Sequence, residues 1–404
     1  MKRLLPALIA TSLCGLTHAQ SPDDLFEALD RELEAEFQAT DAELERQFQA
    51  LDKALKEAFE RAEGEVAGKW GQQEAELPSK KRWADYSEDL QARRIIDFEA
   101  GEVRIDILAD DIEPASLASL LSESAISLRN ATQADLSERD LVLGYAKQTL
   151  AEQAIPLDTY APERQNPIVG QVMGAVPDRT DIEAGLTAVA GGGSVAGLDI
   201  APLANGKQKV SLTIPLRLGF ESTLASRYRG SVLKESARYD LDPSLLYAII
   251  ETESSFNPRA RSPVPAFGLM QLVPKSGGMD AYQHVYGEKL LLDPEYLYQP
   301  DQNVELGAAY LDVLNSRYLR LITNETSRLL CTIAAYNTGA GNVARAFTGK
   351  TNVAEAARII NGMTPEAVYE HLKAHLPYEE TRNYIQKVTR AQDKYAPLDA
   401  RARR

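Results

Sequence analysis

Glu253 stands at the end of a predicted helix, in a position that could give its carboxyl group unusual acid–base properties. The helix is expected to begin at Asp242-Pro243, a capping residue followed by a proline at the first helical position. Apolar residues that share a face with Glu253 stand seven, four and three positions before it, and these are Leu246, Ile249 and Ile250. Glu251 is rotated roughly 200° away at 100° per residue, so it is expected to face solvent.

Burial and the negative end of the helix dipole both disfavour a charged carboxylate, so both are expected to raise the pKa of Glu253. A glutamic acid that keeps its proton near neutral pH can protonate a glycosidic oxygen. On this pattern alone, a structural glutamate bound to a nearby loop explains the position equally well.

Ordered motifs begin at Glu253. They are Glu253-Ser254-Ser255-Phe256-Asn257-Pro258, Ser262-Pro263, Gly268-Leu269-Met270-Gln271 and Ala335-Tyr336-Asn337-Thr338-Gly339-Ala340-Gly341. In this order the motifs resemble the soluble lytic transglycosylase domain, a goose-lysozyme-like fold, and the resemblance covers most of residues 224–395. The mixed region ahead of it, beginning near Trp83, resembles the extra N-terminal domain of the membrane-bound lytic murein transglycosylase C group.

The resemblance implies that Glu253 protonates the bond between N-acetylmuramic acid and N-acetylglucosamine in peptidoglycan. The ionised Glu253 would then act as the base on the muramoyl C6 hydroxyl, which closes onto C1 and leaves a 1,6-anhydro end. Because the nucleophile belongs to the substrate, its effective molarity is high and a second catalytic carboxylate is dispensable.

The resemblance also implies a set of substrate-binding residues, which are Ser262, Gly268, Gln271, Tyr336, Asn337 and Glu380. Gly268 has no Cβ and would let backbone approach the sugar, and Gln271 offers both an amide donor and a carbonyl acceptor. Ser262 matches a sugar-contacting serine of the family.

Tyr336 can stack or hydrogen-bond at the pyranose ring, and Asn337 is expected to help fix the turn that follows. Gly339 and Gly341 are interpreted as a helix stop and restart. Glu380 belongs to a final motif over 378–384 and matches an acidic residue near the cleft; a helix N-terminal charge that pairs with the dipole explains it equally well.

The elements that position these residues indicate a mainly α fold with a smaller α+β domain. Residues 68–218 are expected to form an α+β accessory domain, with a hairpin over 95–107, helices across 116–150 and a strand over 210–216. Residues 222–404 are expected to form the all-α, lysozyme-like catalytic domain. Its predicted helices are Leu224–Tyr239, Pro243–Glu253, Asn303–Tyr318, Ser327–Tyr336 and Tyr378–Tyr395.

Residues 20–66 carry an 11-residue repeat of Phe, Leu and Asp, seen for example at Phe26, Phe37, Phe48 and Phe59. This period corresponds to about 3.67 residues per turn, so it predicts one acidic helix about 60 Å long with a nearly straight apolar stripe. The stripe needs a partner, and self-association in a coiled coil or packing on another protein through 22–63 would supply one. A solvated stalk, or a helix that lies on the next domain, is the alternative.

Residues 1–19 are typical of a signal peptide, because Lys2-Arg3 precedes an apolar run of about 13 residues and small residues follow it. Export to the periplasm follows from this interpretation. Cys14 leaves lipid anchoring at the outer membrane as an alternative, although Leu13 is larger than the residue usual before a lipidated cysteine. Cys331 lies in an apolar run and is expected to be a buried small hydrophobe.

The chain has 404 residues and a formal net charge of −15, with no Lys/Arg block that would follow a phosphate backbone, which argues against nucleic acid as a partner. No motif points to a metal or an organic cofactor, and proton transfer to an acetal needs neither. Two alternatives to the transglycosylase remain: a lysozyme-type muramidase that releases reducing ends, and a non-catalytic wall-binding scaffold.

Overall fold

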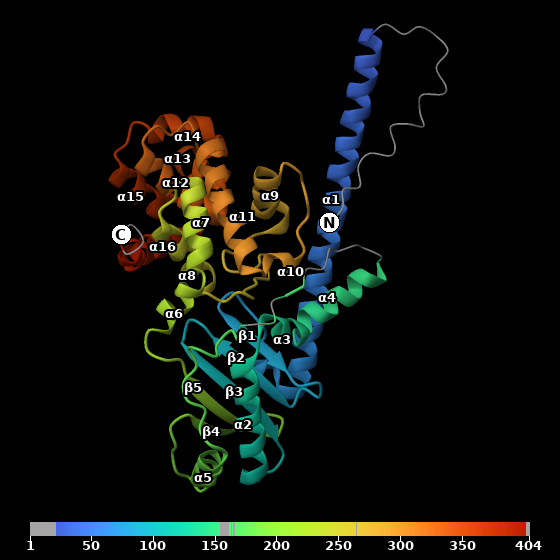
Figure 1. Cartoon of the computed structure of the whole chain (residues 1–404), viewed down its shortest axis with the longest axis vertical. Coiled ribbons are helices and arrows are strands. Elements are labelled where there is room, and N and C mark those ends of the chain that lie inside the picture. Colours follow the sequence, from blue (N-terminus) through green and yellow to red (C-terminus); the bar gives the residue numbers. More distant parts are fainter. Residues whose placement is uncertain (1–21, 154–160, 163, 165, 264, 401–404) are drawn as a thin grey trace, which may run out of the picture. The chain divides into compact units, whose positions relative to one another are not determined.

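The computed structural model describes residues 22–153, 161–162, 164, 166–263 and 265–400 (Figure 1). The predicted signal peptide and Cys14 lie outside the described residues. The chain divides into two compact units, residues 1–47 and 48–404. In the described part of the chain, no helix is both long and apolar enough to cross a membrane.

Helix α1 (Pro22–Trp70) is a single helix, as the 11-residue period predicts. From position 51 onward, one side of this helix is buried, and the buried residues are Leu51, Ala54, Leu55, Ala58, Ala62, Val66 and Trp70. The first five pack in a cluster with Val142, Leu143 and other residues of α4 (Leu141–Glu152). For residues 51–70, the alternative of a helix that lies on the next domain is therefore confirmed.

Five strands form one antiparallel sheet in the order β1-β2-β3-β5-β4. They are β1 (Arg82–Tyr86), β2 (Ala92–Asp97), β3 (Glu102–Ala109), β4 (Leu198–Pro202) and β5 (Gln208–Pro215). The predicted hairpin is confirmed, with Asp97 opposite Glu102. Gly101 in its turn has a φ of 72°, and a Cβ there would come within 2.6 Å of the Phe220 ring, so both backbone and packing require glycine.

The helical pattern over 116–150 forms three helices, which are α2 (Pro114–Asn130), α3 (Gln133–Glu138) and α4. Thr132 caps α3 through a capping box with Asp135, and Asp140 caps α4 by accepting from the Leu143 N–H. Helix α5 (Arg179–Ala190) packs against α2, which in turn contacts β3. A short 3₁₀ turn, η1 (Gln72–Glu74), links α1 to the sheet region.

The C-terminal region is helical, as predicted. Its elements are α6 (Phe220–Arg227), α7 (Arg229–Tyr239), α8 (Pro243–Ser254), π-helix η2 (Pro274–Gly278), α9 (Met279–Tyr286), α10 (Pro294–Leu297), α11 (Pro300–Asp312), π-helix η3 (Val313–Tyr318), α12 (Glu325–Thr338), α13 (Ala340–Thr348), α14 (Val353–Ile360), α15 (Pro365–His375) and α16 (Glu379–Ala400). The helix predicted over 224–239 is broken at Tyr228, which leaves the helical region of φ and ψ.

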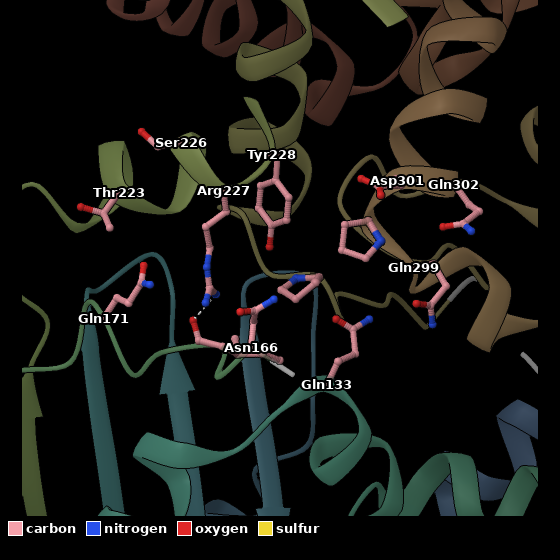
Figure 2. Close-up of a pocket in the computed structure, with 13 residues that line it drawn as sticks. Gln133, Asn166, Gln171, Thr223, Ser226, Arg227, Tyr228, Gln299, Asp301 and Gln302 are labelled. Carbon is pink, nitrogen blue, oxygen red and sulfur yellow. Dashed lines mark hydrogen bonds between the residues drawn. The ribbon is translucent and has the colours of Figure 1, made fainter. Parts of the chain in front are cut away.

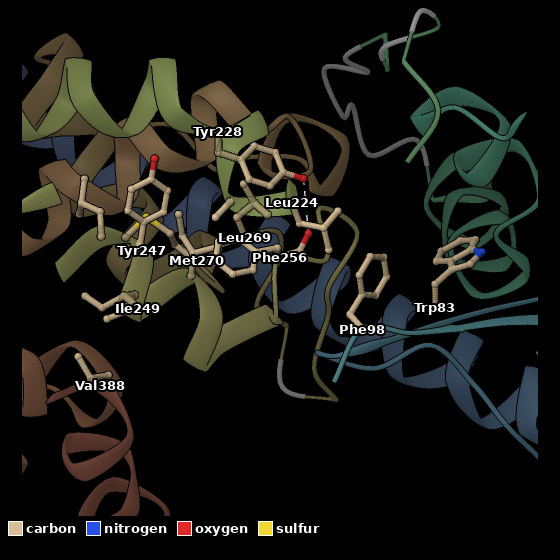
Figure 3. Close-up of a cluster of buried hydrophobic side chains, with 14 of the residues drawn as sticks. Trp83, Phe98, Leu224, Tyr228, Tyr247, Ile249, Phe256, Leu269, Met270 and Val388 are labelled. Atoms are coloured by element: carbon tan, nitrogen blue, oxygen red, sulfur yellow. Dashed lines mark hydrogen bonds between the residues drawn. The ribbon is translucent and has the colours of Figure 1, made fainter. Parts of the chain in front are cut away.

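One hydrophobic core extends from the sheet into the C-terminal helices. Figure 3 shows Trp83 and Phe98 of the sheet region together with Tyr228 and Phe256 of the helical region. The rings of Tyr228 and Phe256 stack, with their centroids 6.4 Å apart. Cys331 is fully buried in this core, so the prediction of a small buried hydrophobe is confirmed. The sheet is thus packed against the C-terminal helices.

Candidate active site

Glu253 lies in the last turn of α8, where the sequence places it. Asp242 caps the helix by accepting from the Ser244 N–H at 2.9 Å, with Pro243 at the first helical position. The helix stops abruptly because Ser255 and Phe256 both have positive φ angles, 50° and 65°. Only 5% of the Glu253 surface is exposed, so its carboxyl group is almost completely desolvated.

The surroundings of Glu253 favour its protonated form. Burial raises the pKa of Glu253 to about 7, and it outweighs the nearest cation, whose charge lowers that pKa. This cation is Lys80, with its Nζ 3.9 Å from Glu253 Oε2 and 3.3 Å from Glu380 Oε1. The charge of Glu380 adds to the raised pKa of Glu253. The prediction of a raised pKa on the buried face of this helix is confirmed.

A cavity of about 220 Å³ opens beside Glu253. Its lining comes from the segment before β1, from α8 and from α16, and consists of Lys80, Lys81, Thr252, Glu253, Glu380, Asn383, Tyr384 and Lys387. Glu380 lies in the first turn of α16 and also lines this cavity, so both interpretations of that residue fit the structure. The cavity therefore joins three segments that are far apart in the sequence.

The hydroxyl of Tyr384 is buried next to this carboxyl group. It makes no hydrogen bond of good geometry to any residue that the structure describes, yet it is close enough to interact with Glu253 and lower the pKa of that acid. Burial, followed by the charge of Glu253, raises the pKa of the Tyr384 phenol well above its usual value. Tyr384 is therefore a neutral donor beside the acid.

A second cavity, of about 330 Å³, brings together Gln271, Tyr336 and Asn337, along with Tyr310 and other residues. The Tyr336 hydroxyl donates to the Met270 carbonyl at 2.8 Å. Burial raises the pKa of the Tyr336 phenol, and the charge of Glu253 raises it further. Tyr336 is therefore close enough to Glu253 for the two groups to interact electrostatically. Three of the predicted substrate-binding residues, Gln271, Tyr336 and Asn337, thus line the same cavity.

The role expected of Asn337 needs correction, whereas that of Gly339 does not. Asn337 does not make the turn: it lies inside α12 and accepts a hydrogen bond from the Thr381 hydroxyl of α16 at 2.7 Å. The turn is made by Gly339, with a φ of 83°, and α13 restarts at Ala340, which confirms the interpretation of a helix stop and restart. Asn337 therefore ties two helices together.

Gly268 has a φ of 77°, and a Cβ there would lie 2.2 Å from the Leu297 carbonyl and 2.4 Å from Asn303 Nδ2. Packing inside the protein thus requires this glycine, whereas the sequence interpretation invoked approach to a sugar. Gln271 is buried, its Nε2 donates to the Gly268 carbonyl at 3.1 Å, and its Oε1 has no hydrogen-bond partner among the described residues. Ser262 lies in the same loop, half-buried, but lines neither cavity.

A buried network of ion pairs holds the loop that carries these residues. Arg261 donates to Asp140 at 2.7 Å, and Arg259 pairs with Glu295 at 3.1 Å and with Asp140 at 3.6 Å. All four side chains are at most 1% exposed. Because Asp140 caps α4, the loop is anchored to the helices ahead of the catalytic region.

Glu251, which was expected to face solvent, does so only in part. Its carboxylate pairs with Lys394 of α16 at 2.9 Å, and its side chain is 26% exposed. Glu251 and Glu253 lie on different sides of α8, as the helical spacing predicts, because they line different cavities. The nearest cation thus lies 2.9 Å from the Glu251 carboxylate but 3.9 Å from that of Glu253.

A larger polar cavity of about 700 Å³ lies away from Glu253 (Figure 2). Arg227 crosses it and donates to the carbonyl groups of Pro167 and Ile168, which holds that segment to α6. Gln133, Gln299 and Asp301 are among its lining residues. It contains none of the predicted site residues, and no cluster of His, Cys, Asp and Glu suited to a metal ion occurs in the described part of the chain.

Sequence reasoning missed two parts of the site. Lys80 lies 173 positions before Glu253, and no local pattern distinguishes it from other surface lysines. Tyr384 belongs to the final motif over 378–384, but the sequence did not show that its hydroxyl lies beside Glu253. The buried pairs of Arg259 and Arg261 were also not anticipated.

Comparison with known proteins agrees with this arrangement. Residues 231–359 match the Transglycosylase SLT domain family, and residues 47–154 match the family of the membrane-bound lytic murein transglycosylase C N-terminal domain. A buried acid at the end of α8 inside the first match defines the chain as a lytic transglycosylase of the SLT class.

The match extends over most of the chain. Membrane-bound lytic murein transglycosylase C of Sodalis glossinidius is 33% identical over 335 residues, which cover 82% of this chain and 87% of that protein. The protein of the same name from Mannheimia succiniciproducens is 32% identical over 331 residues, covering 81% and 85%. The chain therefore belongs to the membrane-bound lytic murein transglycosylase C family. Among solved structures, the lytic transglycosylase Slt of Pseudomonas aeruginosa is 29% identical, with a TM-score of 0.33 over 42% of this chain and 24% of that one.

Proposed function

We propose that this protein cleaves the β-1,4 bond between N-acetylmuramic acid and N-acetylglucosamine in peptidoglycan, with Glu253 as the general acid and then the base. One observation carries the proposal: Glu253 is buried in a cavity where its pKa is raised to about 7. An acid with a pKa near the working pH holds its proton until a basic oxygen arrives and can take a proton back afterwards.

Glu253 donates one proton in the first step and takes up another in the second, so it ends in the protonation state in which it began. Glu253 gives its proton to the oxygen that links the two sugars, and the bond from that oxygen to the muramoyl C1 breaks. The Glu253 carboxylate then takes the proton of the muramoyl C6 hydroxyl, whose oxygen bonds to C1 and forms the 1,6-anhydro ring. Lys80, at 3.9 Å, stabilises the carboxylate between the steps, and Tyr384 is a neighbouring hydrogen-bond donor.

The neighbouring cavity supports a role in holding the sugars. The unpaired Gln271 Oε1 offers a buried acceptor for a sugar hydroxyl, and Tyr336 offers a ring face beside it. Asn337 positions these groups through its hydrogen bond with Thr381. Ser262 and Gly268 shape the loop that borders the sugar site, and Glu380 acts through its pairing with Lys80.

The proposed organisation is a signal peptide over 1–19, a long helix over 20–66, an accessory domain over 68–218 and a catalytic domain over 222–404. The protein acts in the periplasm, and lipidation at Cys14 would hold it at the outer membrane. Its relatives are named membrane-bound lytic murein transglycosylase C, which supports a place in the cell envelope. The acidic residues 22–47 are proposed to localise the enzyme by self-association, in a coiled coil, or by binding another protein.

Digestion of purified sacculi tests the proposed reaction. Wild-type protein should release muropeptides with 1,6-anhydro ends, which mass spectrometry distinguishes because they are one water lighter than reducing ends. Glu253→Gln keeps the shape of the side chain and should reduce release by about 10²–10⁴-fold. Glu366→Gln, at an exposed position of α15, is the matched control and should keep full activity.

Three other outcomes would each point elsewhere. Reducing ends alone would indicate a lysozyme-type muramidase. Undiminished cleavage by Glu253→Gln would remove this residue from the mechanism. Binding of sacculi by the wild-type protein without any cleavage would indicate a scaffold.

A further inference from the structure

The short loop around Gln271 has a backbone conformation that its surroundings must stabilise. Gln271 has a φ of 50°, in the left-handed region that residues other than glycine adopt at an energetic cost. Phe267 and Leu272 close the loop around it, because each donates its N–H to the carbonyl of the other, at 3.0 and 3.1 Å. Strained backbone of this kind persists only where neighbouring groups fix it. The groups that pack on this loop therefore decide where the Gln271 amide lies.

Arg261 is joined to this loop through its backbone. It forms an antiparallel bridge with Phe267, and the Gly268 N–H donates to the carbonyl of Ala260, the residue before Arg261, at 2.8 Å. The Arg261 side chain is 1% exposed, so its charge is almost completely desolvated. A displacement of Arg261 would therefore displace Phe267 and, with it, the loop that carries Gln271.

Asp140 is the one carboxylate that pairs with Arg261 in the described part of the chain. The Arg261 Nη2 donates to Asp140 Oδ1 at 2.7 Å, while its Nε and Nη1 have no hydrogen-bond partner among the described residues. Arg259, in contrast, pairs with Glu295 as well as with Asp140. A buried cation with a single anionic partner depends on that partner, because its loss leaves the charge uncompensated. The position of Arg261 is therefore set by Asp140.

Asp140 belongs to the proposed accessory domain, whereas Arg261 and Glu253 belong to the proposed catalytic domain. Asp140 stands immediately before α4, inside the match to the N-terminal domain family, and Arg261 and Glu253 lie inside the match to the SLT family. Burial and groups other than Asp140 and Arg261 chiefly set the pKa of Glu253. The contact thus extends from the accessory domain to the loop around Gln271 without acting on the acid.

We propose that Asp140 is a positioning residue for glycan binding: through Arg261 it holds the loop around Gln271 in the conformation that binds the sugar. This inference rests on the proposed function, in which Gln271 accepts a hydrogen bond from a sugar hydroxyl. The accessory domain then sets glycan affinity by a contact within the protein. Because Asp140 acts on neither the reacting bond nor the Glu253 carboxyl group, its loss should weaken binding and leave the chemical step unchanged.

Steady-state kinetics of the full chain on soluble glycan strands test the proposal. Asp140→Asn removes the charge but keeps a side chain that can cap α4. Its KM should rise roughly tenfold, as expected when a buried hydrogen bond between charged groups is lost, while kcat should stay within about twofold. The alkaline limb of the profile of kcat/KM against pH should not move. Partial unfolding would instead lower kcat, because it reduces the fraction of active enzyme, and would leave KM unchanged.

Arg261→Met tests the same contact from the other side. It removes the buried charge itself, so it leaves no uncompensated cation and decides the question even if Asp140→Asn fails to fold. Its KM should rise to a similar extent, and the double variant should bind no more weakly than either single variant, because all three lack the same interaction. An unchanged KM in Arg261→Met would overturn the proposal.

Asp106→Asn is the matched control. Asp106 is also a fully buried carboxylate of the accessory domain, and it pairs with the buried Arg93 at 2.6 Å within the sheet. The substitution should lower the free energy of unfolding, as Asp140→Asn does, but should leave KM within about twofold of wild type. If it raised KM to the same extent, general destabilisation of the accessory domain would explain the effect and the proposal would be wrong.

Binding without turnover distinguishes failure of this inference from failure of the proposed function. In a Glu253→Gln background, calorimetry measures the affinity for a soluble tetrasaccharide of alternating N-acetylglucosamine and N-acetylmuramic acid. Adding Arg261→Met should weaken binding roughly tenfold. If wild type gave no anhydro products while this loss of affinity held, the reaction would be wrong and the role of Asp140 would stand; an unchanged affinity would refute that role.

Discussion

Glu253 and Glu295 are both buried, yet the pKa values of their carboxyl groups are shifted in opposite directions. Glu253 is 5% exposed and its pKa is raised to about 7, whereas Glu295 is 1% exposed and its pKa is lowered to about 2. Burial raises the pKa of both, and it is the largest influence on each. The groups that surround each carboxyl therefore make the difference.

Glu295 is surrounded by donors. Arg259 lies 3.1 Å from it, Lys147 lies 3.1 Å from it, and the Ser137 hydroxyl donates to it, which together more than reverse the effect of burial. Glu253 has Lys80 at 3.9 Å, and that lysine is shared with Glu380. A buried carboxyl is thus structural where its charge is fully compensated and available for proton transfer where it is not.

The largest expected effect comes from breaking the compensated site. Arg259→Met removes the fully buried cation that Glu295 and Asp140 share, so the free energy of unfolding should fall by about 3–5 kcal/mol. Urea denaturation at pH 7 measures it. Arg229→Met, an exposed arginine, is the control and should change it by less than about 0.5 kcal/mol. Similar effects of the two substitutions would mean that the network contributes no more than a surface residue.

Neutralising the two glutamates should change stability with opposite signs. The folded protein binds the Glu253 proton more tightly than the unfolded chain, whose glutamate has a pKa near 4.5. Its contribution therefore destabilises the fold as pH rises from about 4.5 to 7, by about 3 kcal/mol in total. Glu253→Gln should remove this loss, so the variant should be more stable than wild type at pH 8 and equal to it at pH 4.

Glu295→Gln is the contrasting variant. Its folded pKa of about 2 lies below the unfolded value, so its charge stabilises the fold above pH 4.5 and that contribution is lost as pH falls towards 2. The variant should be less stable than wild type at pH 8. Denaturation curves from pH 4 to pH 8 measure both differences. If both variants changed stability in the same direction at pH 8, the contrast between the sites would be wrong.

The sequence predicted what depends on local spacing. Asp242 and Pro243 start α8, and the apolar residues at 246, 249 and 250 place Glu253 on a buried face, because a helix repeats every 3.6 residues. The 11-residue repeat of α1 was predicted from the same helical spacing, and the hairpin from two apolar strand segments around a turn that contains Gly101. Element type and the burial of Glu253 therefore followed from short-range patterns.

The partners of these residues come from distant segments, and local spacing contains no information about them. Lys80 precedes β1, and Asp140 caps a helix more than a hundred residues before the arginines that it binds. The same limit explains why the reason for Gly268 was not predicted: the space that a Cβ would occupy there is taken by Asn303 of the distant helix α11. Helices α14 and α15 were missed, although Asn352 and Thr364 are ordinary helix caps that signal their starts.

The smallest predicted effect concerns Lys80, whose charge partly offsets the burial of Glu253. Lys80→Met removes that charge and also leaves Glu380 without its partner, and both changes raise the pKa of Glu253. Because Lys80 is partly exposed, the alkaline limb of the profile of kcat/KM against pH should move up by roughly half a unit. Lys350→Met, at an exposed position, should leave the limb in place. An unchanged or lowered limb in Lys80→Met would show that this cation does not affect the pKa of Glu253, and the contrast would then depend only on the groups that surround Glu295.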